Sequence, residues 1–196
     1  MAKLIGINKV KTAVFISGTG SNLKNLINFS KTKKSPISIN LIISNIFKAK
    51  GLRYGNQYKI KKKTLNFKNI KIAEKRLLNL LKRNRIKFIC LAGFMKILSS
   101  KFIKQFNGKI INIHPSLLPR YKGLNTHSRA IQNKDKFTGC SVHYVTEKLD
   151  SGKIIIQKKI KILKKDTPKS LAKKVLKQEH KLYPKAILKM FVYLIL

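Results

Sequence analysis

Apolar residues gather in short runs along this chain, and several of the intervening segments carry apolar positions at helical spacing. Short apolar runs at 12–17, 37–44, 87–92, 109–114, 140–145 and 154–162 predict β-strands. Helices are predicted where apolar residues recur at helical spacing, which is after residue 22, over 72–81 and from Thr167 onward. We expect Pro184 to kink or end the last of these helices. The basic stretch 48–63 carries Gly51 and Gly55 and predicts a short helix and a loop on a solvated surface.

Strands and helices therefore alternate through most of the chain, without an internal repeat or a linker. This order predicts an α/β fold, a doubly wound and mainly parallel sheet with helices on both faces. The 196 residues, of which 43% are hydrophobic, suit a single domain spanning 1–196. In such a sheet ligands bind at the carboxyl ends of the strands, so candidate chemistry is sought there.

The charge is extreme, because 45 basic residues face six acidic ones, for a net charge of +39. Such a charge suggests a nucleic-acid binder, yet nearly all of it is lysine and it is spread along the whole chain. We interpret it as the product of AT-rich coding DNA and expect no specific nucleic-acid partner. Because no window of eighteen uncharged apolar residues and no signal-peptide pattern occurs, we expect a cytoplasmic protein without a membrane span. Cys90 and Cys140 suggest neither a zinc site nor a disulfide framework and are interpreted as packing residues.

A glycine loop, Gly18-Thr19-Gly20-Ser21-Asn22, separates the first strand from the first helix. Glycines allow close backbone approach, and a helix N-terminus offers free N–H groups to a phosphate. The third glycine of a dinucleotide-binding fingerprint is replaced by Leu23, so a phosphate site and a plain tight turn both stay open.

Asn112 and His114 are two residues apart at the end of a strand and are expected to project from the same face. Acyl transfer requires such a pair, a hydrogen-bond donor for the developing oxyanion and a base for the amine proton. Asp150, in a turn after another strand, could reach the same crevice, raise the pKa of His114 and orient its ring. A structural histidine and an ordinary Asp-Ser-Gly turn are the alternatives, and His127, His143 and Glu179 have no interpretation from the residues alone.

Five ordered blocks at 16–23, 91–98, 111–127, 141–152 and 178–184 closely resemble the phosphoribosylglycinamide formyltransferase family, folate-dependent enzymes of purine synthesis. The blocks are ISGTGSNL, LAGFMKIL, INIHPSLLPRYKGLNTH, SVHYVTEKLDSG and QEHKLYP. The resemblance runs from about residue 12 to 190 and implies a Rossmann-like sheet. It implies transfer of the formyl group of 10-formyltetrahydrofolate to the amine of phosphoribosylglycinamide, without a metal, by a monomer or a homodimer.

The resemblance also assigns roles to residues. Asn112, His114 and Asp150 would be the catalytic trio, with His114 as a base or a charged stabiliser. Phosphoribosylglycinamide would be held by Gly20, Ser21, Asn22 and Glu179. Folate would be held by Met95, Lys96, Ile97, Leu98, Asn112, Thr146, Glu147, Lys148, Leu149 and Asp150.

The chain departs from its relatives at Ile70, where they carry a folate-contacting arginine, and Lys71 is a candidate replacement. Ser128 stands at another position where relatives often have arginine. Many relatives also have a longer C-terminal segment than this chain. Methionyl-tRNA formyltransferase shares the Asn-x-His core, but that family carries a further C-terminal domain. Formyltetrahydrofolate hydrolases usually carry an additional N-terminal domain. A lysine-rich nucleic-acid binder on an old enzyme fold is the non-enzymatic alternative.

Overall fold

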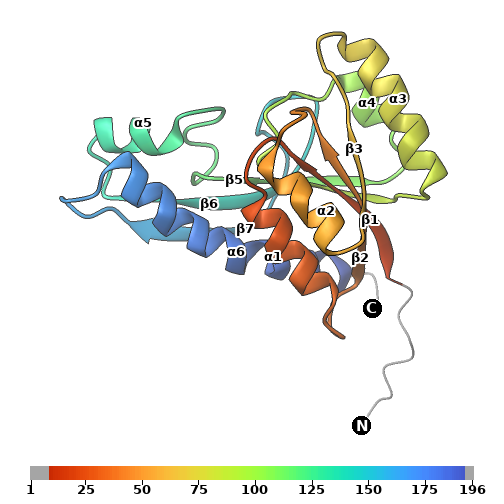
Figure 1. The fold of residues 1–196 in the computed structure, drawn as a ribbon. Helices are drawn as coiled ribbons and strands as arrows, with labels where there is room; N and C mark the ends of the chain where they lie inside the picture. The colour runs from red at the N-terminus through yellow and green to blue at the C-terminus, as the bar shows by residue number, and fades with distance from the viewer. Residues whose placement is uncertain (1–8, 193–196) are drawn as a thin grey trace.

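A seven-stranded sheet forms the centre of the molecule in the computed structural model, which describes residues 9–192 (Figure 1). Its strands are β1 (Val10–Ile16), β2 (Ile37–Ser44), β3 (Lys61–Thr64), β4 (Phe88–Leu91), β5 (Lys109–His114), β6 (Phe137–Tyr144) and β7 (Ile154–Lys161). They lie in the order β3-β2-β1-β4-β5-β6-β7. The five strands from β3 to β5 are parallel, whereas β6 and β7 are antiparallel to their neighbours. The predicted fold, a mainly parallel α/β sheet, is confirmed.

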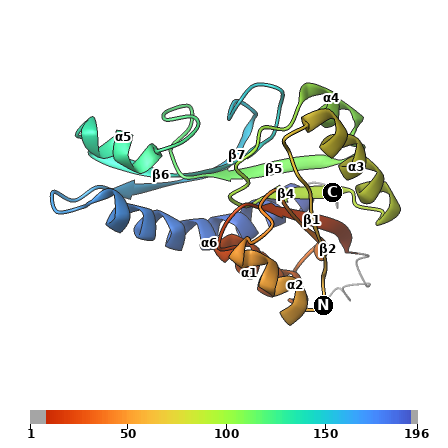
Figure 2. The same ribbon diagram turned by 45° about the horizontal axis from the view of Figure 1, so that its top comes forward.

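Helices cover both faces of the sheet, with α1 and α6 on one face and α3 and α4 on the other (Figure 2). The helices are α1 (Ser21–Ser30), α2 (Arg53–Gln57), α3 (Ile70–Arg83), α4 (Ser100–Gln105), α5 (Thr126–Gln132) and α6 (Pro168–Val192), with a 3-10 turn, η1, at Lys50–Leu52. Two buried apolar clusters result from this layering. One packs α1 and α6 against the sheet through residues such as Leu26 and Tyr183, and the other packs α3 and α4 through residues such as Leu77 and Phe102.

The chain leaves β1 toward β2 on one side and returns to β4 on the other, so the strand order reverses between β1 and β4. At such a switch point the loops after the two strands diverge and leave a crevice at their carboxyl ends. The glycine loop follows β1, and residues 92–98 follow β4, so both lie at this crevice. The predicted location of ligand binding is thus set by the topology.

Several predicted segments differ from the structure. Lys61–Thr64 was expected to be a loop but forms β3, an exposed edge strand whose lysines discourage pairing with a further strand. The helices α4 and α5, six and seven residues long, were not predicted, because their short apolar patterns carry little periodicity. Cys90 and Cys140 are free and fully buried, which confirms their interpretation as packing residues.

Helix α6 continues through Pro184, so of the two expected outcomes, a kink or an end of the helix, the end does not occur. Proline has no N–H and leaves the carbonyl four residues earlier without its helical donor. That carbonyl belongs to His180, and it accepts a hydrogen bond from Asn25 Nδ2 of α1 at 2.7 Å. The neighbours Tyr183 and Ala186 are fully buried, so packing against the sheet holds the helix on both sides of the proline.

Residues 1–8 and 193–196, which belong to the predicted domain 1–196, lie outside the described residues. Within 9–192, no helix combines the length and the apolar character that crossing a membrane requires.

Candidate active site

A cavity of about 900 Å³ lies at the switch point, between the loops that follow β1, β4, β5 and β6. It is lined by the glycine loop, by Leu91–Leu98, by the end of β5, by part of α5, by residues 145–150 and by one side of α6. All of the residues predicted from the sequence as catalytic, amine-substrate or folate contacts line this single cavity. The structure thus brings together predicted residues that are up to 159 positions apart in the chain, from Gly20 to Glu179.

The N-terminus of α1 forms one end of the cavity. Gly20 caps the helix with φ 74°, and a Cβ added there would lie 2.7 Å from the Cα of Gly51. Glycine is therefore required for both conformation and space. No side chain caps the helix, so its first N–H groups are available to an anion. The geometry fits the phosphate-site interpretation of this loop.

Glu179 of α6 is buried beside this helix terminus and is 7% exposed. Its Oε2 accepts a hydrogen bond from Asn22 Nδ2 at 2.7 Å. Burial raises the pKa of the Glu179 carboxyl above its ordinary value, against the opposing effect of the Asn22 bond. Asn22 Oδ1 is buried without a hydrogen-bond partner, so this polar pair still has an acceptor to offer to a ligand in the cavity.

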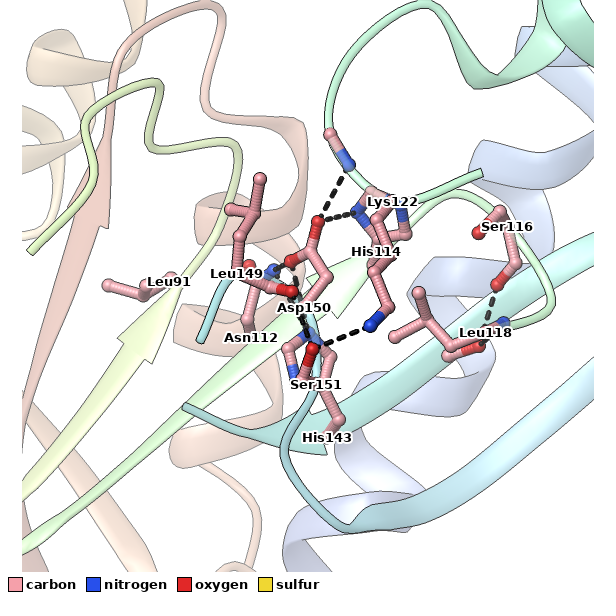
Figure 3. A network of polar contacts seen from close by, with 12 residues as sticks. Leu91, Asn112, His114, Ser116, Leu118, Lys122, His143, Leu149, Asp150 and Ser151 are labelled. Atoms are coloured by element: carbon pink, nitrogen blue, oxygen red, sulfur yellow. Dashed lines mark hydrogen bonds and ion pairs between the residues drawn. The ribbon is translucent and has the colours of Figure 1, made fainter. Parts of the chain in front are cut away.

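The expected same-side projection of Asn112 and His114 from β5 is observed, and both line the cavity. Asp150 lies between them, as Figure 3 shows. Its Oδ2 is 3.4 Å from His114 Nδ1, and its Oδ1 accepts a long contact of 3.5 Å from Asn112 Nδ2. The Gly123 N–H donates to Oδ2 at 2.9 Å. An amide, an imidazole and a carboxylate thus converge on one wall.

The turn that carries Asp150 is strained in a way that suits a functional site, because Asp150 has φ 45°. Its side chain is 8% exposed. Burial by itself would raise the pKa of the Asp150 carboxyl, but the contacts with His143, the Gly123 N–H and His114 together lower it. Asp150 is consequently ionised at neutral pH while largely removed from solvent.

The ring of His114 lies between two groups, with its Nε2 2.8 Å from the carbonyl oxygen of Tyr121 and its Nδ1 3.4 Å from Asp150 Oδ2. The carbonyl requires a hydrogen on Nε2, which leaves Nδ1 as the basic nitrogen of the neutral ring. We expected Asp150 to raise the pKa of His114, and its charge does act in that direction. Burial outweighs it, with smaller contributions from His143 and Arg129, so the pKa of His114 is lowered. The neutral form is therefore the resting state at pH 7.

The sequence did not identify His143, which the structure places against the same carboxylate. It lies on β6 directly opposite Asn112, and its Nε2 is 3.3 Å from Asn112 Nδ2 and 3.5 Å from Asp150 Oδ1. The available signal was the alternation of two polar residues, Ser141 and His143, in the otherwise apolar segment 140–145.

The loop between β5 and α5 supplies the Tyr121 carbonyl that holds His114, and side chains fix this loop from outside the cavity. Tyr121 Oη donates to Asp135 Oδ2 at 2.7 Å, and Arg120 binds Asp135 Oδ1 at 2.8 Å. Lys122 Nζ donates to Ser151 Oγ at 2.6 Å, which links the loop to the Asp150 turn (Figure 3). These contacts hold the two segments that flank His114 in a fixed relation.

The far end of the cavity is apolar. Met95, Ile97 and Leu149 line it while 61%, 64% and 49% exposed, which is a high exposure for large apolar side chains. Met95 N donates to Ser17 Oγ at 2.7 Å, so this wall is attached to the loop after β1. An exposed apolar wall of this kind fits an aromatic ligand.

Neither Ile70 nor Lys71 lines the cavity, since both lie at the start of α3. The expected replacement of the missing arginine by Lys71 therefore has no support, and the lysines of the wall are Lys96 and Lys148.

Comparison with known proteins agrees with this geometry. The formyl transferase family model matches residues 10–187. The chain belongs to the formyl transferase family. This formyl transferase is 39% identical to phosphoribosylglycinamide formyltransferase of Escherichia coli over 177 residues, which is 89% of the chain and 84% of that enzyme. The resemblance found from the five sequence blocks is confirmed.

Solved structures support the same relationship. Phosphoribosylglycinamide formyltransferase from Brucella melitensis superposes on the formyl transferase with a TM-score of 0.88 at 39% identity, covering 93% of this chain and 96% of that one. The enzyme from Anaplasma phagocytophilum gives a TM-score of 0.86 at 40% identity, with coverages of 92% and 85%.

Some relatives are much longer than this formyl transferase. The human trifunctional purine biosynthetic protein adenosine-3 is 40% identical over 182 residues, and the match covers 91% of this chain but 18% of that protein. The match covers between 14% and 18% of the length of its trifunctional relatives.

Proposed function

We propose that this protein transfers the formyl group of 10-formyltetrahydrofolate to the primary amine of phosphoribosylglycinamide in purine biosynthesis. The observation that carries the proposal is the convergence of Asn112, His114 and Asp150 on one wall of the cavity at the switch point. Phosphoribosylglycinamide is proposed as the formyl acceptor because the bacterial relatives are phosphoribosylglycinamide formyltransferases, and the match covers most of their length. The formyl donor, 10-formyltetrahydrofolate, is the one implied by the resemblance of the five sequence blocks.

The two ends of the cavity suit the two substrates. The phosphate would bind the uncapped N-terminus of α1 at Gly20, Ser21 and Asn22, where backbone N–H groups and the helix dipole favour an anion. Glu179 would accept hydrogen bonds from the ribose hydroxyls or the glycinamide end.

The folate would lie along the apolar wall, against Met95, Ile97, Leu98 and Leu149, with Lys96, Thr146, Glu147 and Lys148 around it. All eight contacts were predicted from the resemblance, and the exposed apolar side chains of Met95, Ile97 and Leu149 independently support a ligand at this wall.

The proposed reaction is direct. The amine nitrogen bonds to the formyl carbon, the formyl oxygen becomes an oxyanion, and Asn112 Nδ2 donates a hydrogen bond to it, an effect worth about 10²–10³ in rate. His114 takes the amine proton at Nδ1, directly or through a water held by Asp150, and the resulting imidazolium lies between Asp150 and the Tyr121 carbonyl. The oxyanion then reforms the carbonyl and the bond from the formyl carbon to the folate nitrogen breaks, as that nitrogen receives the proton that His114 took from the amine.

The proposal is tested by formyl transfer from 10-formyltetrahydrofolate to phosphoribosylglycinamide, followed by folate absorbance. Wild type is compared with Asp150→Asn, His114→Ala and a control, Asp166→Asn, which removes a carboxylate that does not line the cavity. We expect turnover in wild type and in the control, and losses of roughly 10²–10⁴ in the two site variants. Absence of turnover in folded wild type, or formyl transfer to methionyl-tRNA in its place, would overturn the proposal.

A further inference from the structure

We propose that His143 is a positioning residue, which holds the Asn112 amide so that its nitrogen, and not its oxygen, faces the reacting formyl group. This inference rests on the proposed function. His143 is 1% exposed, lies outside the trio named above, and makes contact with two of its members.

The orientation of the His143 ring is fixed by the backbone. Its Nδ1 lies 2.9 Å from the carbonyl oxygen of Tyr144, and a carbonyl only accepts, so Nδ1 carries a hydrogen. With its hydrogen on Nδ1, the ring presents Nε2 to the Asn112 amide as an acceptor. The Tyr144 carbonyl is itself held in place, because Gly152 packs so closely on it that an added Cβ would lie 1.8 Å away.

The Asn112 amide has two possible orientations that differ by a half-turn, and its surroundings select one of them. Nδ2 faces His143 Nε2 at 3.3 Å and Asp150 Oδ1 at 3.5 Å, and both of these atoms are acceptors. In the flipped orientation the amide oxygen would face a ring lone pair and a carboxylate, and both contacts would be repulsive. The pair His143 and Asp150 therefore selects the orientation in which Asn112 is a donor.

The distribution of the two amide hydrogens explains why His143 is needed in addition to Asp150. One N–H is directed to His143, and the second is held only loosely by Asp150. That second N–H is free to move to the oxyanion when the formyl carbon becomes tetrahedral. Without His143, a flip of the amide would bring its oxygen to the oxyanion and remove the stabilisation of the transition state.

The strand geometry is adapted at this position. The register between β6 and β7 shifts between Val142 and His143, where β7 carries an extra residue. A bulge of this type bends the strand and redirects its side chains, and it is frequent beside active sites. The bulge in β7 lies opposite His143, and Gly152 packs on the carbonyl of the next residue, Tyr144.

Two substitutions separate this role from a structural one. His143→Asn keeps an N–H near the position of Nδ1 for the Tyr144 carbonyl but removes the acceptor that faces Asn112. His143→Gln extends an amide oxygen to the position of Nε2 and can accept from Asn112, at the expense of the Tyr144 contact. We expect kcat to fall roughly 10- to 100-fold in His143→Asn and to be substantially restored in His143→Gln, with both KM values changed less than about 3-fold.

A double-mutant cycle provides the second readout. In an Asn112→Ala background, His143→Asn should change kcat by less than about 3-fold, because the group that it positions is gone. Equal activity of His143→Asn and His143→Gln, or additive losses in the cycle, would overturn the inference.

The contact can also be observed without turnover, through the side-chain amide resonances of Asn112 in ¹⁵N-labelled protein. They should move in His143→Asn and return toward the wild-type position in His143→Gln. If this pattern appears while wild type transfers no formyl group, the proposed function fails and the contact stands. If wild type is active and the resonances are unchanged in both variants, the inference fails alone.

Discussion

The hydrogen bond from Asn25 to the His180 carbonyl gives a prediction that can be worked out from the structure. It joins α1 to α6 one turn away from the Asn22–Glu179 pair, so it supports the phosphate end of the cavity. Because Pro184 has no N–H, Asn25 Nδ2 replaces the helical donor of this carbonyl. Asn25→Ala therefore removes a hydrogen bond and leaves a partly buried acceptor without a helical replacement.

The expected loss of stability follows from general values. An unsatisfied buried polar group costs about 1–3 kcal/mol. For a protein of this size a loss of 1 kcal/mol lowers Tm by roughly 2–4 °C, so Asn25→Ala should lower Tm by between about 2 and about 12 °C. Urea unfolding followed by far-ultraviolet circular dichroism measures the loss in the free energy of unfolding directly. An unchanged m-value would show that the folded state keeps its compactness.

Pro184→Ala supplies the matched background. An alanine at 184 has an N–H that can donate to the His180 carbonyl in the normal helical pattern. In that background Asn25→Ala should cost less by about 1 kcal/mol, which is a coupling that a double-mutant cycle resolves. If Asn25→Ala costs the same in both backgrounds, the explanation of how α6 continues through its proline is wrong.

Three further results are expected. Because the net charge of +39 is self-repelling in the compact state, Tm should rise with sodium chloride as the charges are screened, and an insensitive Tm would contradict this. Since burial lowers the pKa of His114 from its ordinary 6.5, the basic form prevails above that value, and kcat/KM should be flat near pH 7 and fall only below 6.5. A decline that begins above pH 7 would exclude neutral His114 as the base. Glu179→Gln should raise the KM for phosphoribosylglycinamide about 10-fold, through loss of about 1.4 kcal/mol, and leave the KM for folate unchanged.

The strands could be predicted where local pattern and burial coincide. Lys109–His114 was predicted with the observed bounds because its apolar residues are buried in the sheet. Strand β3 could not be predicted in this way, because Lys61, Lys62 and Lys63 are exposed and the strand is defined by its pairing with β2. The end of α6 was misjudged for a related reason, because the donor that satisfies the His180 carbonyl comes from a helix about 155 residues away in the chain.

The same distinction applies to the site. Asn112 and His114 could be predicted as neighbours because two positions on one strand share a face. Their relation to His143 depends on the antiparallel pairing of β5 with β6 and on the register shift at His143, and neither feature has a local signal. Likewise, the pKa of His114 depends on burial in the assembled cavity, which outweighs the raising effect of the Asp150 charge that the sequence argument had considered.

The acidic residues connect the unusual composition with the function. Of the six, only Glu147 has a well-exposed side chain, at 45%. Asp135 and Asp166 are 9% and 3% exposed and ion-paired, and Glu74 is buried and bonded to Ser99, so these three hold structural elements together. Asp150 and Glu179 are the other two, and they lie in the cavity.

A chain that retained carboxylates for solubility would keep them on its surface, where this one has almost none. The distribution is the one expected if a coding bias toward lysine acts on every position and carboxylates persist only where folding or catalysis depends on them. This interpretation makes a direct prediction about function. Replacing surface lysines with glutamate away from the cavity, for example Lys33→Glu and Lys34→Glu, should raise Tm at low salt and leave kcat unchanged. A large loss of kcat in such variants would instead assign the surface charge a part in the reaction.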